Sequence, residues 1–341
     1  MVFNEYIKKY APLIESHLLE FFKSKKKDLE FNPYVLELFN NIEEYTMRGG
    51  KRLRPILMIV GYKLYGGKNE EEIIKASCSI EMVQSYLLIH DDVIDESNLR
   101  RNKPTLHKIY EKKYNDKKFG DNMAIIAGDL ASIYAQQVLD STSFQTDLKY
   151  KAMMKMASII ETTGYGQVID VFSSKLNDFN EKNLFQLHEY KTAKYTIEGP
   201  LILGAILAGG NDFSLINNYS IPVGIAFQLQ DDILGLFGDE ETIGKPVTSD
   251  LEEGKKTLLI LKAMEDVRYR DYILNILGKR NISRDELENI REIVRKTGAL
   301  DYTFSLAKDL VKKGIEALKE IDSDEKLFLK EFAEYVIGRK F

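Results

Sequence analysis

Hydrophobic residues recur every three to four positions along nearly the whole chain. This period is typical of amphipathic α-helices, because residues three and four apart share one helix face. Residues 72–95 are hydrophobic on most sides, as expected for a helix in the centre of a bundle. The pattern predicts helices over residues 34–46, 72–95, 121–140, 148–172, 181–195, 199–209, 213–237 and, with breaks, 256–338.

The sequence shows no comparable pattern for β-strands or for domain boundaries. Alternating polar and apolar residues between hairpin turns, which would indicate strands, are nearly absent. Turn residues such as Gly49-Gly50 and Gly66-Gly67 separate the helices, but no break resembles an interdomain linker. We therefore expect one all-α domain over residues 1–341.

Composition narrows the classes of protein and partner. The 341 residues are 44% hydrophobic, which is ample for a buried core. The net charge of −5 provides no basic field for nucleic acid, so we expect no nucleic-acid partner. The one cysteine, Cys78, excludes an intramolecular disulfide and is typical of a reducing compartment.

Targeting and membrane signals are also weak. The first twelve residues lack the apolar core of a signal peptide. The longest apolar run, residues 200–208, is about half as long as a membrane-spanning helix requires. These features predict a cytoplasmic protein with no membrane span.

A first acidic motif, His90-Asp91-Asp92-Val93-Ile94-Asp95, ends the apolar helix. Asp91 and Asp95 are four residues apart and share a face, and Asp92, about 100° away, can lean toward the same rim. Repulsion between three carboxylates requires a counter-charge, which a hard cation such as magnesium supplies. One such motif alone is a weak signal, since a solvent-facing helix end has the same composition.

A second acidic motif, residues 227–235 (FQLQDDILG), also ends an apolar helical run. Gln228, Asp232 and Gly235 lie along one face, with Asp231 beside them. Two such helices facing each other would form an apolar cavity with aspartates at its mouth. That cavity suits a ligand with a diphosphate head and an apolar tail. The pair of motifs is much more specific than either one.

Basic residues accompany the acidic motifs. The segment GGKRLRP, residues 49–55, starts a helix after a glycine turn, where backbone N–H groups favour an anion. Lys51 and Arg54 can converge on that anion, and Arg100-Arg101 follow the first acidic motif. Together these pairs predict two diphosphate sites, one bound through metal and one through side chains. Further basic or polar candidates are Lys191, Thr192, Lys194, Lys245, Lys255 and Lys256.

Five segments together resemble the trans-type isoprenyl diphosphate synthases, and in particular the geranylgeranyl diphosphate synthases. They are GGKRLRP, HDDVIDESNLRRNKPT, HEYKTAKYT, FQLQDDILGLFGD and GKPVTSDLEEGKKT, in the family's order from residue 49 to residue 257. The resemblance covers almost the whole chain. It implies a bundle of long helices around a deep central cavity, a homodimer, and magnesium as cofactor, three ions per active site.

The resemblance also implies roles for individual residues. The magnesium ligands would be Asp91, Asp92, Asp95, Asp231 and Asp232. The allylic diphosphate would be held by Arg100, Lys191, Thr192, Gln228, Lys245 and Lys255, of which Lys191 and Lys245 would assist catalysis as fixed positive charges. Isopentenyl diphosphate would be held by Gly50, Lys51, Arg54, Arg101 and Gln84, the last standing where many relatives have histidine.

The second motif departs from the family pattern. Gly235 stands where many members carry a third aspartate. Asp239, one turn further on, is the candidate replacement. The number of protein ligands to the third metal ion therefore stays open.

The implied reaction is the magnesium-dependent elongation of allylic diphosphates (dimethylallyl, geranyl and farnesyl) with isopentenyl diphosphate. Tyr86 stands five residues before Asp91, about 7–8 Å along the helix. An aromatic residue here, with no insertion in the first motif, resembles the geranylgeranyl (C20) type, and Val83 and Leu87 would be its neighbours at the cavity floor. A farnesyl or longer product is the alternative.

Two other functions share some of these sequence features. A terpene cyclase would also use an aspartate-rich motif, but its second metal motif usually mixes Asn, Ser or Thr with Glu, whereas this chain has Asp231-Asp232. A non-catalytic synthase subunit usually loses aspartates, whereas this chain keeps five at the two motifs. Both alternatives therefore rank below the synthase.

Overall fold

The computed structural model describes residues 1–29, 31–176, 178–239 and 246–339. Helices dominate these ranges, which confirms the all-α prediction. The chain forms two compact units. Unit 1 comprises Met1–Ala157, Pro200–Phe213 and Ser323–Phe328, and unit 2 comprises Ser158–Gly199, Ser214–Asp322 and Leu329–Phe341. The organisation as one domain stays a prediction.

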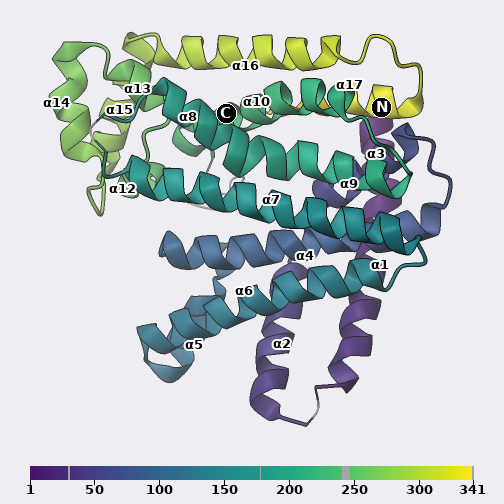
Figure 1. Ribbon diagram of the computed structural model, residues 1–341. Coiled ribbons are helices and arrows are strands. Elements are labelled where there is room, and N and C mark those ends of the chain that lie inside the picture. The colour runs from purple at the N-terminus through teal and green to yellow at the C-terminus, as the bar shows by residue number, and fades with distance from the viewer. Residues whose placement is uncertain (30, 177, 240–245, 340–341) are drawn as a thin grey trace. The chain divides into compact units, whose positions relative to one another are not determined.

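Unit 1 is built around α4 (Glu70–Ile94), which packs along α6 (Lys117–Asp140), as Figure 1 shows. The same helix also contacts α1, α2 and α3. The apolar character of residues 72–95 thus follows from contacts on several sides. The other elements up to residue 140 are α1 (Val2–Lys27), α2 (Pro33–Thr46), α3 (Leu53–Leu64), β1 (Leu99–Arg100), β2 (Lys103–Pro104) and α5 (Leu106–Tyr114).

Unit 2 is built around α10 (Ser214–Phe237), which packs against η1 (His188–Glu198) and α16 (Ala299–Glu316). Two helices run from unit 1 into unit 2, namely α7 (Thr146–Ser173) and α17 (Asp324–Gly338). The remaining helices of unit 2 are α8 (Glu181–Leu187), α12 (Ser249–Glu252), α13 (Leu258–Ala263), α14 (Val267–Ile276) and α15 (Arg284–Lys296), whereas α9 (Gly199–Leu207) belongs to unit 1 from Pro200 on. No helix in the described ranges is long and apolar enough to cross a membrane.

Side-chain caps fix where several helices begin. Asn32 accepts hydrogen bonds from the backbone N–H groups of Tyr34 and Val35, with Pro33 as the first residue of α2. Ser283 and Glu286 form a reciprocal capping box at the start of α15. Such caps satisfy backbone donors that the helix itself leaves unpaired, so the chain marks these boundaries locally.

Two glycines allow helices to approach closely. A Cβ atom on Gly204 of α9 would overlap the carbonyl oxygen of Met58 in α3. In unit 2, a Cβ atom on Gly224 of α10 would lie against Ala193 of η1. The second contact matters for function, because it sets the distance between the second acidic motif on α10 and the basic residues on η1.

Two local features differ from the sequence prediction. The first is a two-residue hairpin, in which Leu99 pairs with Pro104 and Arg100 with Lys103. Strands this short show no alternation, so the pattern missed them. The second is η1, a π-helix where an α-helix was expected. The hydrophobic period does not distinguish helix types, and π-helical segments are often found at functional sites.

Candidate active site

The first acidic motif lies at the end of α4 in unit 1. Asp91 and Asp92 belong to its last turn, and Asp95 is the residue that follows the helix. The backbone N–H of Asp95 donates to the carbonyl oxygen of Asp91 at 2.8 Å, so the helical turn continues and the two side chains lie one turn apart. Asp91 and Asp95 are partly exposed and Asp92 is buried.

Both carboxylate oxygens of Asp92 are occupied by neighbouring side chains. The Tyr45 hydroxyl donates to Oδ2 at 2.6 Å, and Nε and Nη2 of Arg100 donate to Oδ1 at 2.8 and 2.6 Å. Burial raises the pKa of Asp92, and the nearby Arg100 opposes the shift. This geometry indicates that Asp92 orients Arg100. Its role as a metal ligand stays a prediction.

The hairpin after α4 directs two arginines to different places. Its turn residues, Arg101 and Asn102, have φ values of 55° and 58°, as in the tight turns that close two-residue hairpins. Arg100 is thereby held against Asp92, while the Arg101 guanidinium donates to the carbonyl oxygen of Gly49. The hairpin therefore links the acidic motif to the glycine turn of the basic segment.

The basic segment GGKRLRP adjoins a small pocket in unit 1. Arg54 donates to the side-chain oxygen of Gln84 on α4 at 2.9 Å. A Cβ atom on Gly50 would lie 3.2 Å from the Arg101 guanidinium, so only glycine fits there without displacing it. The pocket has about 240 Å³ of empty space and is lined by Tyr45, Thr46, Arg48, Glu81, Gln84, Ser85, Leu88, Arg100 and Arg101. It gathers Gln84, Arg100 and Arg101 from the predicted set.

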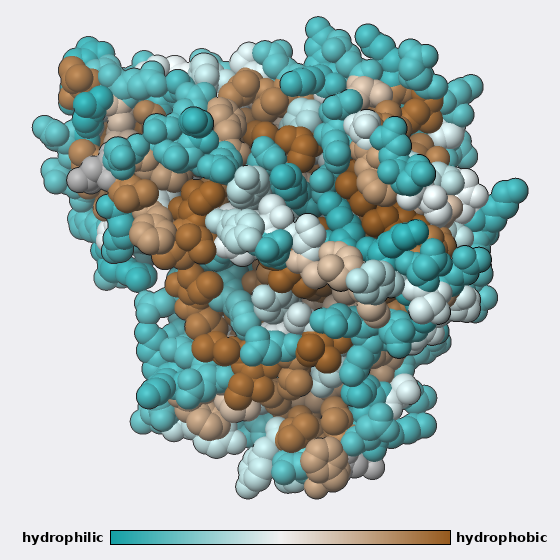
Figure 2. All heavy atoms as spheres, viewed as in Figure 1, coloured by the Kyte–Doolittle hydropathy of each residue, from teal (hydrophilic) through white to brown (hydrophobic). Residues whose placement is uncertain are grey.

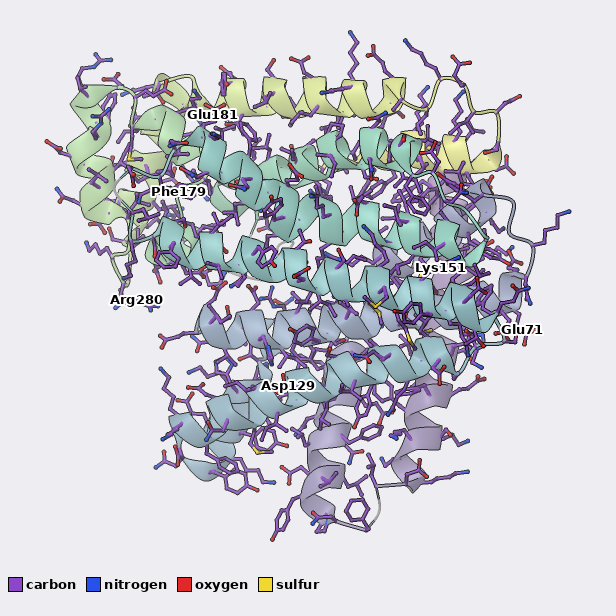
Figure 3. All side chains as sticks on the ribbon, in the orientation of Figure 1. Glu71, Asp129, Lys151, Phe179, Glu181 and Arg280 are labelled. Carbon is purple, nitrogen blue, oxygen red and sulfur yellow. The ribbon has the colours of Figure 1, made fainter. Side chains whose placement is uncertain are left out.

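The residues predicted to limit chain length lie one to two turns before Asp91 on α4. Val83 is fully buried, whereas Tyr86 and Leu87 are partly exposed. The Tyr86 ring packs edge-on against the His90 ring, with centroids 4.9 Å apart. Burial, and then Asp129, raises the pKa of Tyr86. Asp129 belongs to α6 (Figure 3), so Tyr86 lies on the side of α4 that faces that helix.

In unit 2, a chain of hydrogen bonds connects η1 to the second acidic motif. The Thr192 hydroxyl donates to Oε1 of Gln228 at 2.7 Å, and Nε2 of Gln228 donates to Oδ1 of Asp232 at 2.8 Å. Nε2 of the buried His188 lies 3.6 Å from Oδ2 of Asp232. The structure thus brings together three predicted residues, and the amide of Gln228 fixes the buried Asp232.

Two partners of predicted residues were missed by the sequence analysis. Nζ of Lys191 lies 2.5 Å from Oδ2 of Asp170, a carboxylate of α7. Nη1 of Arg339, near the end of the chain, lies 2.7 Å from Oδ1 of Asp231. A lone aspartate within the apolar text VIDVF was a signal for Asp170. Nothing in the sequence connected Arg339 to residue 231, because the contact joins segments more than a hundred residues apart.

At Gly235, where many relatives carry a third aspartate, a carboxylate from another segment lies close by. A Cβ atom at this position would lie 2.7 Å from Oδ2 of Asp250, so the Asp250 carboxylate lies directly over the glycine. Asp239 is exposed, and its role as the replacement for the third aspartate stays a prediction. Residues 235 and 250 share a pocket with Asp232 and Lys255 that has about 260 Å³ of empty space. Asp250 was missed because it follows the motif by fifteen residues.

The remaining predicted cations have different surroundings. Lys255 forms an ion pair with Glu253. Lys256 donates to the carbonyl oxygens of Ser173 and Leu176, at 2.9 and 2.6 Å, so it caps the end of α7 instead of reaching a ligand. Lys245 lies outside the described residues.

The donor atoms fit magnesium, although the described residues alone do not complete a site. Among the described residues, no three carboxylate, histidine or cysteine side chains form a metal-binding group. The partly exposed Asp91, Asp95 and Asp231 offer the hard oxygen atoms that magnesium prefers. Magnesium usually keeps several waters and binds substrate phosphates, so few protein ligands suffice.

Comparisons with known proteins agree with these features. The family model described as Polyprenyl synthetase matches residues 36–294. A geranylgeranyl diphosphate synthase of Sulfolobus acidocaldarius is 35% identical over 86% of this chain and 88% of its own. A geranylfarnesyl diphosphate synthase of Aeropyrum pernix is 32% identical over 85% of this chain and 91% of its own.

A solved structure is also similar. It is the geranylgeranyl pyrophosphate synthase of Corynebacterium glutamicum complexed with isoprenyl diphosphate and magnesium. Its TM-score is 0.92 with 28% identity, and the match covers 97% of this chain and 99% of that one. Because the family model spans most of the sequence and the fold agrees, this chain belongs to the polyprenyl synthetase family and is a prenyltransferase.

Proposed function

We propose that this enzyme elongates allylic diphosphates with isopentenyl diphosphate and that its main product is geranylgeranyl diphosphate (C20). The observation that carries the C20 product is Tyr86, a half-buried aromatic side chain five residues before Asp91. The Sulfolobus acidocaldarius relative, itself a geranylgeranyl diphosphate synthase, supports the same product. The similarity to the geranylfarnesyl diphosphate synthase of Aeropyrum pernix means that a C25 product is the alternative that must be excluded.

Magnesium would be held by aspartates in each unit. In unit 1 these are Asp91 and Asp95, with Asp92 acting mainly through Arg100. In unit 2 they are Asp231 and Asp232, joined by Asp250 in place of a third aspartate. When bound, magnesium would draw charge onto the allylic diphosphate and so favour ionisation of its C–O bond. The proposal includes three magnesium ions per active site.

The fixed cations would stabilise the leaving diphosphate. Arg100 is held by Asp92, and Lys191 is held by Asp170, so each positive charge is already in place before the substrate binds. Such preorganised charge stabilises a developing negative charge without reorganising at the moment of reaction. Gln228 would donate a further hydrogen bond through its second amide N–H, Thr192 would hold that amide in place, and Lys245 and Lys255 would add positive charge.

Isopentenyl diphosphate would bind at the basic segment of unit 1. Lys51, Arg54 and Arg101 would contact its diphosphate, the small Gly50 would leave room for it, and Gln84 would donate a hydrogen bond. The double bond of isopentenyl diphosphate attacks C1 of the allylic cation and forms a new C–C bond. Proton loss to the released diphosphate then restores a double bond and gives an allylic diphosphate five carbons longer.

We propose that the chain forms a homodimer through α6 and α7. α6 exposes Ile125, Ile126 and Ile133, and Figure 2 shows brown side chains over this helix. α7 exposes a longer apolar series: Tyr150, Met154, Tyr165, Val168, Val171 and Phe172. Exposed apolar patches of this kind on a folded chain usually mark an interface. We also propose a cytoplasmic location, which fits the buried free thiol of Cys78.

The test is a product analysis with purified protein. Isopentenyl diphosphate, magnesium and one primer (dimethylallyl, geranyl or farnesyl diphosphate) are incubated, and the chain lengths are identified. A mainly C20 product that disappears with a chelator supports the proposal. Products of C25 or longer contradict the role of Tyr86. A cyclised hydrocarbon, or no reaction from folded protein, would favour the cyclase or the non-catalytic subunit.

A further inference from the structure

Four cationic residues lie within residues 48–54, three of them in the basic segment and Arg48 just before it, and the structure separates them into two groups. The side chains of Arg48 and Arg52 are 2% and 0% exposed, whereas Lys51 is exposed and Arg54 is partly exposed. Arg48 pairs with Glu44 at 2.8 Å. The two buried arginines are thus already paired within the protein, although the sequence of residues 48–54 does not distinguish them from Lys51 and Arg54.

Arg52 has the most extensive set of contacts. Its Nη1 donates to Oε1 of Glu81 at 2.5 Å and to the carbonyl oxygen of Thr46 at 3.0 Å. Its Nε donates to Oε1 of Glu15 at 3.2 Å. These partners come from α4, from the end of α2 and from α1, so one guanidinium joins three helices of unit 1 at the start of α3.

The backbone at Arg52 needs this support. Its φ of 51° lies in the left-handed region, which non-glycine residues adopt only when surrounding contacts hold them there. The residue follows Gly49 and Gly50, which have φ values of 89° and 120°. The chain therefore reverses direction just before α3, and the side-chain contacts of Arg52 are the anchor of that reversal.

The anchor acts on the same face of α4 that the substrate-binding residues use. Glu81 pairs with Arg52, and Gln84, three residues later, accepts from Arg54 at 2.9 Å. Ser85 is hydrogen-bonded to Thr46 at 2.8 Å. The start of α3 is therefore held to α4 at two successive points. A shift of the Arg52–Glu81 contact would therefore displace Lys51, which precedes Arg52, and Arg54, which follows it.

We propose that the buried Arg52–Glu81 pair is a positioning device for the isopentenyl diphosphate site. It fixes the segment between Gly50 and α3 so that Lys51 and Arg54 present their charges to the diphosphate, while Arg52 itself does not touch the substrate. The inference rests on the proposed function, because it assumes that this segment binds isopentenyl diphosphate. Arginine is required because its planar guanidinium group donates hydrogen bonds to three partners at once. The ammonium group of lysine, on a flexible side chain, does not hold the same geometry.

The test compares Michaelis constants for the two substrates in full-length variants. Arg52→Lys and Glu81→Gln are expected to raise the KM for isopentenyl diphosphate about 10-fold or more. The KM for the allylic substrate and kcat should change less than about threefold. The reason is that the variants weaken only the binding of isopentenyl diphosphate, and they weaken it equally in the ground state and the transition state. Phe39→Leu, a core change in α2, controls for general destabilisation and should leave both KM values near the wild type.

A double variant separates positioning from folding. Arg52→Met or Glu81→Leu alone leaves a buried charge without its partner, which destabilises the fold, whereas the two changes together remove both charges. The double variant should regain thermal stability relative to the single variants yet keep the raised KM for isopentenyl diphosphate. A wild-type KM in the double variant would overturn the inference.

A Lys51→Ala variant distinguishes failure of the proposed isopentenyl diphosphate site from failure of the positioning role of Arg52. If Lys51→Ala leaves the KM for isopentenyl diphosphate unchanged, the segment is not the site, and the proposed site and the inference fail together. If Lys51→Ala raises that KM and the Arg52 and Glu81 variants do not, the site stands and only the positioning role fails. If all three raise it, with the allylic KM unchanged, both stand.

Discussion

The two acidic motifs have the same paired aspartates but different surroundings. In each pair the second aspartate is buried and the first is partly exposed: the side chain of Asp92 is 1% exposed and that of Asp91 20%, and Asp232 and Asp231 are 7% and 38% exposed. In unit 1 the buried carboxylate is paired with a cation, Arg100. In unit 2 it is held by a neutral amide, Gln228, and lies near a buried histidine.

The difference shows how each unit supplies positive charge. In unit 1 the cation lies eight residues beyond the aspartate that holds it, so the motif and its hairpin form a local device. In unit 2, Lys191 is held by a separate carboxylate, Asp170, from another helix. A change at the buried aspartate should therefore disturb a cation in unit 1, but a hydrogen-bond chain in unit 2.

The largest effect is expected from the first aspartates. Asp91→Asn and Asp231→Asn should each lower kcat by on the order of 1,000-fold, because each would remove a charged oxygen ligand from the proposed magnesium site. Both changes are at partly exposed positions, so the melting temperature should change little. Steady-state kinetics with circular dichroism would check this. A much smaller loss for one of them would show that the two motifs are not equivalent.

The next effect concerns the missing third aspartate. Asp250→Asn should lower activity about 100-fold and raise the magnesium concentration needed for half-maximal rate. The exposed Asp239→Asn is the matched control and should stay within about twofold. Gly235→Asp should also reduce activity, because the new carboxylate would lie against Asp250. Higher activity in Gly235→Asp would contradict the assignment of Asp250.

Stability should separate the two motifs. Arg100→Gln leaves the buried Asp92 carboxylate without its cation and should destabilise the protein by about 3 kcal/mol. Gln228→Ala removes a neutral donor from Asp232 and should destabilise it by about 1–2 kcal/mol. Urea unfolding of both variants at pH 8 would measure the difference. Equal losses would show that the two carboxylates are held in equivalent ways.

The chain length of the product should depend on Tyr86 of α4. Tyr86→Ala should shift the product beyond C20 while the rate stays within a fewfold, because only the space beside α4 changes. Leu87→Ala, at a predicted neighbour on the cavity floor, should shift the product length less than Tyr86→Ala, because a smaller side chain is removed. Chromatography of the dephosphorylated products would report both. An unchanged C20 product in Tyr86→Ala would move the length limit to another residue.

The smallest effect is on the pH dependence of stability in unit 1. Burial lowers the pKa of His107 below its usual value of about 6.5. The folded state therefore binds this proton less readily than the unfolded state, so its contribution is complete above pH 6.5 and is lost as the pH falls below it. The melting temperature of wild type should fall more steeply than that of His107→Gln between pH 7 and pH 5.

Much of this site was predictable because its signals are local. The cap at Asn32, the apolar length of α4, the paired aspartates and the glycine turn each depend on residues close in sequence. The pairings of Asp170 with Lys191 and of Arg339 with Asp231, and the approach of Asp250 to Gly235, were not predictable, because each brings together residues from different segments of the chain. The π-helical form of η1 was missed for a related reason, since the hydrophobic pattern of residues 188–198 is helical either way.

The sequence by itself determined the helical fold class, the order of the motifs and the residue types available for diphosphate and magnesium. These depend on periodicity, capping and spacing along a single helix. Only the tertiary structure decided which carboxylates are buried, which cations are already paired, and which arginine anchors the basic segment. Burial and pairing depend on neighbours from other helices, so identical letters such as the four cations of residues 48–54 acquire different roles only when the chain folds.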